Sequence, residues 1–136
     1  MEPFQVHILA ADKTFYEGPC VSLTIPTSDG ELGIWAHHAA MIAAVQPGTL
    51  RYQLPEEEPR IAAISPGMVK VEKNVVLVLV ASIERPEEID AARARREADQ
   101  AREIILQKKS RQEYQIAQGN LARALNRLRI SSRGLG

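Results

Sequence analysis

The stretch Ala81-Ser82-Ile83-Glu84-Arg85-Pro86-Glu87-Glu88-Ile89-Asp90 divides the chain into two parts with different hydrophobic patterns. All eight prolines lie at or before Pro86. Before it, runs such as Met68-Val69-Lys70-Val71-Glu72 alternate apolar and polar residues, a period of about 2 that is typical of strands. After it, apolar residues recur every three or four positions, as in helices. The sequence predicts a β domain over residues 1–85 and a helical arm over residues 86–136.

The length of 136 residues and the hydrophobic content of 45% fit one modest core with an appendage. The formal net charge of zero hides an asymmetry between the two parts. Residues 1–86 carry six Lys and Arg against ten Asp and Glu, a net −4, and residues 87–136 carry eleven against seven, a net +4. Because acidic residues are interleaved with the arginines of the second part, we expect no nucleic-acid partner. An acidic protein or a small anion fits better.

Cys20 is the only cysteine, which rules out an intrachain disulfide and a cysteine-built zinc site and indicates a reducing compartment. Its expected role is a small core residue. No uninterrupted apolar run exceeds seven residues, as in Val75 to Ala81, so we expect no segment that crosses a membrane. No nucleophile, base and orienting group occur at a recognisable spacing, and there is no Walker-type glycine loop. The sequence therefore predicts no catalytic residues and no metal site.

Turn signals separate many short apolar runs in the first part, which favours an antiparallel β-sandwich. Val75–Val80 is apolar on both faces, so we expect it in the middle of the sandwich, where neither side meets water. Shorter strands are expected near Phe15 and Ile34. The main predicted strands are Phe4–Ala10, Cys20–Ile25, Thr49–Leu54, Arg60–Ser65, Met68–Glu72 and Val75–Ala81.

The segment from Pro26 to Ala39 is denser in special residues than a simple hairpin requires. It contains Gly30-Glu31-Leu32-Gly33-Ile34, a short loop, and His38-Ala39. In this pattern the chain resembles the epsilon subunit of bacterial and chloroplast proton-translocating ATP synthases, and the likeness covers essentially the whole chain. Flanking motifs match in the same order: Phe15-Tyr16-Glu17-Gly18, Pro47-Gly48 and Leu50-Arg51.

The chain departs from the family pattern in three loops. Trp35-Ala36 stands where Leu-Pro is common, Ala40 where proline is common, and Ser65-Pro66-Gly67 where Ser-Gly-Gly is usual. The departures concern local loop geometry.

The resemblance implies a sandwich at the foot of the rotary stalk, against the gamma subunit and the c-ring of the membrane sector. It would place Glu31 and His38 near that ring. From the residues alone, a glutamate on a turn and two adjacent histidines are more often solvated surface. His37 and His38 are expected to point to opposite faces of an extended segment, which argues against a shared metal site.

The sequence of the second part, residues 86–136, predicts an antiparallel hairpin of two helices. The first helix is expected to begin at Pro86, and Ser110 with Glu113 forms a capping-box start for the second, after a break near Lys108-Lys109. Four buried alanine methyl groups contribute only about 3 kcal/mol, and Gly119 costs about 1 kcal/mol relative to alanine, so the hairpin should be weak. Each helix has one seam with spacings of three and four: Ala91, Ala94, Ala98, Ala101 and Ile105, then Tyr114, Ala117, Leu121, Ala124 and Leu128.

At the open end of this hairpin, Arg93 should face residues 125–127, so that Arg123 and Arg127 flank Asp90 and Arg93. The arrangement predicts a polar pocket with three guanidinium groups and one carboxylate. The plainer alternative is that Asp90 pairs with Arg93 while Arg123 and Arg127 are solvated surface charges.

The resemblance implies a ligand for this pocket. The ATP-binding motif of some bacterial epsilon subunits contains Ile or Leu, Asp, two variable residues, Arg and Ala, followed by arginines of the second helix. Gln100 departs from it, because some ATP-binding members carry an arginine there. ATP would be a regulatory ligand, with no obligatory cofactor, and its binding residues would be Glu84, Ile89, Asp90, Arg93, Ala94, Arg123 and Arg127.

The family implies a non-catalytic rotor subunit that couples proton translocation to ATP synthesis. Its hairpin would switch between a compact form and an extended form that inhibits hydrolysis, with ATP favouring the compact one. Alpha and beta subunits of the catalytic head would be further partners. The location would be the cytoplasmic face of the bacterial plasma membrane, or the stromal face of the thylakoid. Two alternatives remain: a structural coupler without nucleotide, and a free-standing adaptor whose basic arm docks an acidic helix bundle.

Overall fold

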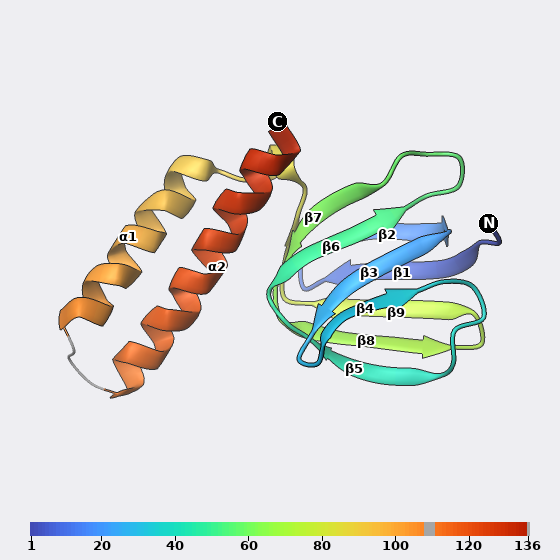
Figure 1. Ribbon diagram of the computed structural model, residues 1–136, viewed down its shortest axis with the longest axis horizontal. Coiled ribbons are helices and arrows are strands. Elements are labelled where there is room, and N and C mark those ends of the chain that lie inside the picture. The colour runs from blue at the N-terminus through green and yellow to red at the C-terminus, as the bar shows by residue number, and fades with distance from the viewer. Residues whose placement is uncertain (108–110, 136) are drawn as a thin grey trace. The chain divides into compact units, whose positions relative to one another are not determined.

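The computed structural model describes residues 1–107 and 111–135. It contains two compact units, Met1–Glu84 and Arg85–Gly136 (Figure 1). The first unit consists of strands and the second is helical. The turn predicted at Lys108-Lys109 and the capping box predicted to begin at Ser110 lie outside the described residues.

The strands of the first unit form a ten-stranded sheet (Figure 1). Their order is β10-β7-β6-β3-β5-β8-β9-β1-β2, and β4 pairs with β3 beside this path. The bounds are β1 (Phe4–Ala10), β2 (Lys13–Cys20), β3 (Ser22–Thr27), β4 (Gly30–Ile34), β5 (Met41–Val45), β6 (Gly48–Gln53), β7 (Arg60–Ile64), β8 (Gly67–Glu72), β9 (Val75–Val80) and β10 (Ile83–Glu84).

Contacts between β2 and β6 show that this sheet folds over onto itself. The Phe15 ring packs edge-on against Tyr52, with ring centroids 5.7 Å apart. The buried Cys20 thiol donates to the Gln53 carbonyl at 3.3 Å, and the Val21 N–H donates to the same oxygen at 2.8 Å. Burial raises the pKa of the Cys20 thiol above its ordinary value. The predicted sandwich, and the core role of Cys20, are confirmed.

One pair of strands departs from the predicted antiparallel arrangement. β1 pairs with β2 antiparallel on one side but with β9 parallel on the other, in a register that runs from Gln5 opposite Val75 to Ala10 opposite Val80. The other pairs in the sheet are antiparallel. The alternation of apolar residues is the same for both strand directions, so it does not specify which one is used.

The core of this unit comes from the alternate residues that each strand turns inward. Each fully buried aliphatic side chain contributes about 1.5–3 kcal/mol relative to exposure. At the β8–β9 turn Lys73 and Asn74 both have positive φ, 51° and 62°, as a two-residue hairpin requires. The largest fully buried side chains are Ile8, Leu23, Ile25, Ile34, Leu50 and Ile83.

The strand β9 is central in the sheet, between β8 and β1, but the prediction that neither face meets water is wrong. Val76, Val78 and Val80 are buried, whereas Val75 is 40% exposed and Leu79 is 37% exposed. Its apolar residues therefore serve two surfaces, the core and an outer face of the first unit.

The second unit contains a short 3₁₀ helix, η1 (Pro86–Glu88), and two long helices, α1 (Ala91–Gln107) and α2 (Arg111–Leu135). The predicted helix start at Pro86 is wrong for α1, because Pro86 begins the 3₁₀ turn and Ile89 then has an extended ψ of 124°. The Arg85 N–H donates to the Glu88 carboxylate at 3.1 Å, which closes the turn on itself. The helix α1 starts three residues after Glu88, at Ala91.

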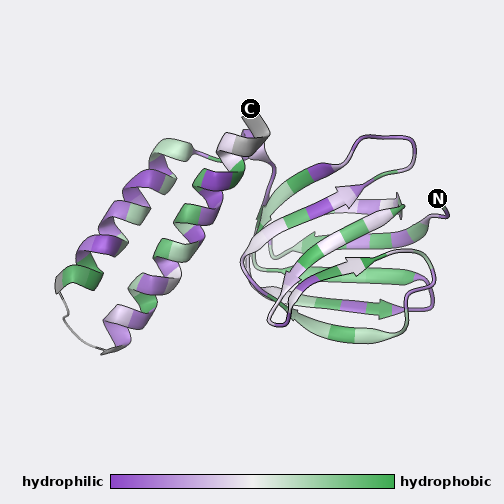
Figure 2. Ribbon diagram, in the orientation of Figure 1, coloured by the Kyte–Doolittle hydropathy of each residue, from purple (hydrophilic) through white to green (hydrophobic). Residues whose placement is uncertain are grey.

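The helices α1 and α2 pack against each other through alanines, and Figure 2 shows hydrophilic and hydrophobic residues alternating along both. The middle of the predicted seam is confirmed, since its alanines are buried. Its outer members Ala91 and Tyr114 are exposed. The buried seam consists of Ala94, Ala98 and Ala101 on α1 and Ala117 and Ala124 on α2.

Candidate functional site

Asp90 caps the first long helix. The Arg93 N–H donates to the Asp90 carboxylate at 2.9 Å, and the Ala94 N–H donates to the Asp90 carbonyl at 3.0 Å. An aspartate at this position satisfies a free backbone N–H and places a negative charge at the positive end of the helix. The plainer alternative paired Asp90 with the Arg93 side chain, whereas Asp90 bonds the backbone N–H of Arg93.

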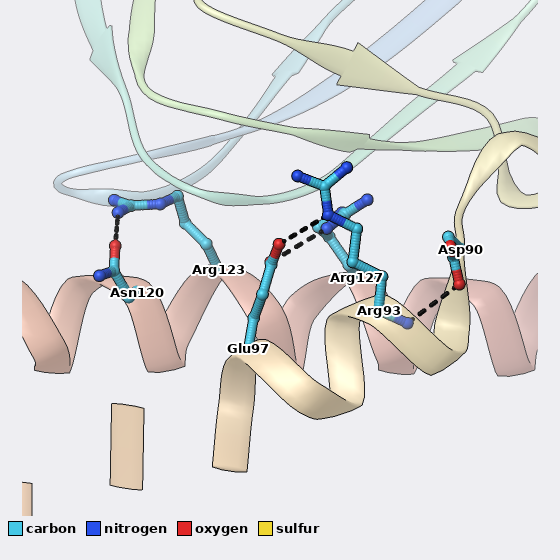
Figure 3. A network of polar contacts seen from close by, with 6 residues as sticks. All are labelled: Asp90, Arg93, Glu97, Asn120, Arg123 and Arg127. Atoms are coloured by element: carbon cyan, nitrogen blue, oxygen red, sulfur yellow. Dashed lines mark hydrogen bonds and ion pairs between the residues drawn. The ribbon is translucent and has the colours of Figure 1, made fainter. Parts of the chain in front are cut away.

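Glu97 joins the two helices. Its Oε1 accepts from Arg93 Nε at 3.1 Å on the same helix, and its Oε2 accepts from Arg127 Nη1 at 3.3 Å on α2 (Figure 3). The side chain of Glu97 is 39% exposed and that of Arg127 is 21% exposed. This ion pair is therefore partly shielded from water, unlike an ordinary surface pair.

The structure brings together only part of the predicted pocket. Arg93 and Arg127 meet at Glu97, and Asp90 bonds only the backbone of Arg93, whereas Arg123 bonds Asn120 on its own helix (Figure 3). Ile89 and Ala94 are buried and contribute packing.

Glu97 was not among the predicted site residues, although the sequence holds a signal for it. It stands four positions after Arg93, the spacing at which an acidic and a basic side chain meet on a helix. Its bond to α2 depends on how the two helices pair, which sequence spacing does not give.

The other predicted residues belong to the first unit. Glu84 lies in β10, opposite Ala63 of β7. Glu31 is exposed in β4, opposite Pro26. His38 is half-buried in the loop after β4, and its Nδ1 lies 2.8 Å from the Ala39 carbonyl.

The segment around His37 is not extended, contrary to prediction. His37 has a positive φ of 64°, and its N–H donates to the Asn74 side-chain oxygen at 2.7 Å. Its Nε2 lies 2.8 Å from the Glu2 carboxylate. These contacts hold the loop between β4 and β5 to the β8–β9 turn and to the chain start.

An apolar surface covers one side of the sheet over β5, β8, β9 and β1, and we call it the outer sheet face. Ile42, Val75 and Leu79 are its exposed apolar members, and Ile42 is 68% exposed. A hollow of about 440 Å³ opens on it beside Lys70 and Lys73. Two rows of register partners build the face: Ile42, Lys70, Leu77, His7 and Glu17, and next to them Ala44, Met68, Leu79, Leu9 and Thr14.

Within residues 1–107 and 111–135, no three His, Cys, Asp or Glu side chains form a group that could hold a metal ion. Neither of the helices as described has the length and apolar character that crossing a bilayer requires.

Comparison with known proteins assigns both parts of the chain. Residues 3–86 match the β-sandwich domain of the ATP synthase delta/epsilon chain, and residues 87–132 match its long α-helix domain. The ATP synthase epsilon chain of Caldanaerobacter subterraneus subsp. tengcongensis is 37% identical over 96% of this chain and 94% of its own length. The ATP synthase epsilon chain of Ruminococcus albus is 36% identical over 98% of this chain and 99% of its own length.

Solved structures share the fold. A chain in the mitochondrial ATP synthase of Euglena gracilis aligns with a TM-score of 0.74 and 24% identity, covering 96% of this chain and 80% of that one. A chain in the central stalk and c-ring of the Tetrahymena thermophila mitochondrial ATP synthase aligns with a TM-score of 0.66 and 15% identity. The alignment covers 97% of this chain and 96% of that one. With both domains matched in order and near full length, the chain belongs to the ATP synthase delta/epsilon family, as a non-catalytic epsilon subunit.

Proposed function

We propose that the two units have different tasks in the rotary enzyme. The β-sandwich attaches to the gamma subunit and to the c-ring, and so helps couple proton translocation to ATP synthesis. The helical arm regulates ATP hydrolysis in the catalytic head of alpha and beta subunits. The subunit meets the membrane only through this complex, at the cytoplasmic face of a bacterial plasma membrane or, alternatively, at the stromal face of a thylakoid.

The outer sheet face carries this proposal. Exposed Ile42 lies on β5, and exposed Val75 and Leu79 lie on β9, with β8 between these two strands of the sheet. Exposed apolar side chains that share one sheet face with charged residues beside them are typical of a protein contact. A partner helix of the gamma subunit would bury this face, and Lys70 at its centre would pair with an acidic residue of that helix. Glu31 and His38 would meet the polar loops of the c-ring.

Substitution of one exposed isoleucine tests the attachment. Ile42→Asp should weaken binding of the full chain to purified gamma subunit about tenfold, because a charge replaces an apolar contact at an interface centre. The control is Ile116→Asp, which changes an isoleucine of α2 that is 56% exposed, against 68% for Ile42. Equal affinities of both variants and the unmodified chain, measured by surface plasmon resonance, would contradict the proposed contact.

The alanine seam of α1 and α2 favours a regulatory task for the arm over a static brace. Alanines bury little area, so separating the helices costs only a few kcal/mol. In the extended form, the basic α2 would enter the acidic catalytic head beside gamma and obstruct rotation in the direction of hydrolysis. A ligand that contacts both helices would favour the hairpin, since only a difference in affinity moves such an equilibrium.

ATP is the proposed ligand, bound through Arg93 and Arg127 from opposite helices. At about 100 times its Kd it would stabilise the hairpin by about 2.7 kcal/mol, which is comparable to the seam. Arg127→Ala should therefore weaken ATP binding and increase inhibition of hydrolysis at high ATP. Arg129→Ala is the matched control, because Arg129 bonds Asn126 on its own helix. Calorimetric titration of the full chains would refute the ATP site if Arg127→Ala bound ATP as the unmodified chain does.

A further inference from the structure

The carboxylate of Glu97 lies where an anionic ligand of the arginines would lie. Each of its oxygens accepts from a different helix, Oε1 from Arg93 of α1 and Oε2 from Arg127 of α2 (Figure 3). Guanidinium groups bind phosphate and carboxylate oxygens through the same N–H donors. A phosphate group that bridged the two helices at this point would compete with Glu97 for the Nε–H of Arg93 and for an N–H of Arg127.

We infer that Glu97 is a built-in occupant of the arginine site: it links α1 to α2 when no ligand is bound, and an anionic ligand has to displace it. The link between the helices stands on the contacts of Glu97 alone. The displacement of Glu97 by an anionic ligand rests on the proposed nucleotide-binding function. It implies that this epsilon chain closes its hairpin with less help from nucleotide than the two arginines suggest.

The charges explain why the carboxylate matters. Arg93 and Arg127 carry like charges on facing helices, and Glu97 between them offsets part of that repulsion. Because the carboxylate is covalently attached to α1, its effective concentration beside Arg127 far exceeds that of a free anion. A free phosphate group must therefore bind strongly enough to overcome an internal competitor.

Asp99 provides a matched comparison on the same helix. Its carboxylate pairs with Arg102 of α1 at 3.6 Å and is 67% exposed, so this pair lies within one helix. Asp99→Asn and Glu97→Gln remove the same charge from α1, two positions apart. Only Glu97→Gln removes an ion pair to α2, and glutamine has nearly the helix propensity of glutamate, so α1 remains intact.

Hydrogen exchange of the full chain without ligand tests the link. Loss of a partly shielded ion pair worth about 1 kcal/mol should accelerate exchange of the seam amides in Glu97→Gln by about three- to tenfold. Asp99→Asn should exchange as the unmodified chain does. Equal exchange in Glu97→Gln and Asp99→Asn would overturn the inference, whatever the ligand results are.

Calorimetric titration with ATP and with inorganic tripolyphosphate tests the displacement. Glu97→Gln should bind both anions about three- to tenfold more tightly than Asp99→Asn, because the competitor is gone. Equal affinities would overturn displacement. If no variant binds either anion while Glu97→Gln still exchanges faster, the link stands, and both displacement and the proposed ATP site are overturned. Tighter binding of tripolyphosphate alone would identify the site as one for phosphate without adenine.

Discussion

Replacing Gly67 with alanine should separate the strands β8 and β9. A Cβ at this position would lie 2.0 Å from the Leu79 carbonyl oxygen and 2.7 Å from the Val80 Cα. Both atoms belong to the backbone of β9, so no side-chain rotation relieves the overlap. Gly67 is also the register partner of Val45 in β5, so a shift of β8 disturbs both neighbouring strands.

The expected cost is at the upper end for overpacking, which typically destabilises by about 1–3 kcal/mol. We expect about 3 kcal/mol, because backbone atoms must move and the neighbours Val45 and Val80 are buried. For a domain of this size each kcal/mol lowers Tm by about 4–8 °C, so the expected fall is about 12–24 °C.

Gly119→Ala is the control, since it makes the same chemical change with ample room. Its Cβ would lie 3.5 Å from Arg123 Nη1, an ordinary contact, in the interior of α2. Alanine should stabilise that helix by about 1 kcal/mol. Differential scanning calorimetry of the two variants should therefore give shifts of opposite sign. A fall of less than about 4 °C in Gly67→Ala, equivalent to under about 1 kcal/mol, would refute the steric argument.

Two further predictions concern a cap and a thiol. Asp90→Ala should destabilise the helical unit by about 1 kcal/mol in urea unfolding, whereas Asp90→Asn should retain most of the cap. Equal losses of stability in the two variants would mean that the carboxylate charge, and not capping, matters. Burial raises the pKa of Cys20, so above about pH 8.5 the unfolded thiol ionises while the folded one stays protonated, and stability should fall as pH rises. Unfolding curves between pH 8 and 10 should show a smaller fall in Cys20→Ala; an identical fall would exclude the thiol as its source.

Alternation and turn residues predicted most of the sandwich. The bounds of β1 agree with the structure, and the β8–β9 turn lies in the gap between the predicted strands Met68–Glu72 and Val75–Ala81. The strand β5 was missed because Met41-Ile42-Ala43-Ala44-Val45 shows no alternation, and its strand character depends on pairing with β8. The exposed face of β9 was missed because an apolar run does not reveal whether its outer side meets core, water or another subunit.

The candidate site was predicted in outline and missed in its central residue. The expected pairing of the helices placed Arg93 near Arg127, and in the structure both bond Glu97, while Asp90 caps the start of α1. Arg123 was misplaced because Asn120, one turn before it, offers a local partner. Glu97 was overlooked as one acidic residue among several, since its role depends on the pairing of two helices.

The parallel pairing of β1 with β9 also constrains the order of events during synthesis. Gln5 leaves the ribosome early, but its partner Val75 is made near the end of the first unit. Long-range pairs of this kind form late, because the chain between them must be ordered first. The sandwich therefore cannot complete its sheet until β9 has emerged. Until then β1 can pair with β2 on one side only. By contrast, the contacts between α1 and α2 join neighbouring segments, so the arm can form as soon as it is made.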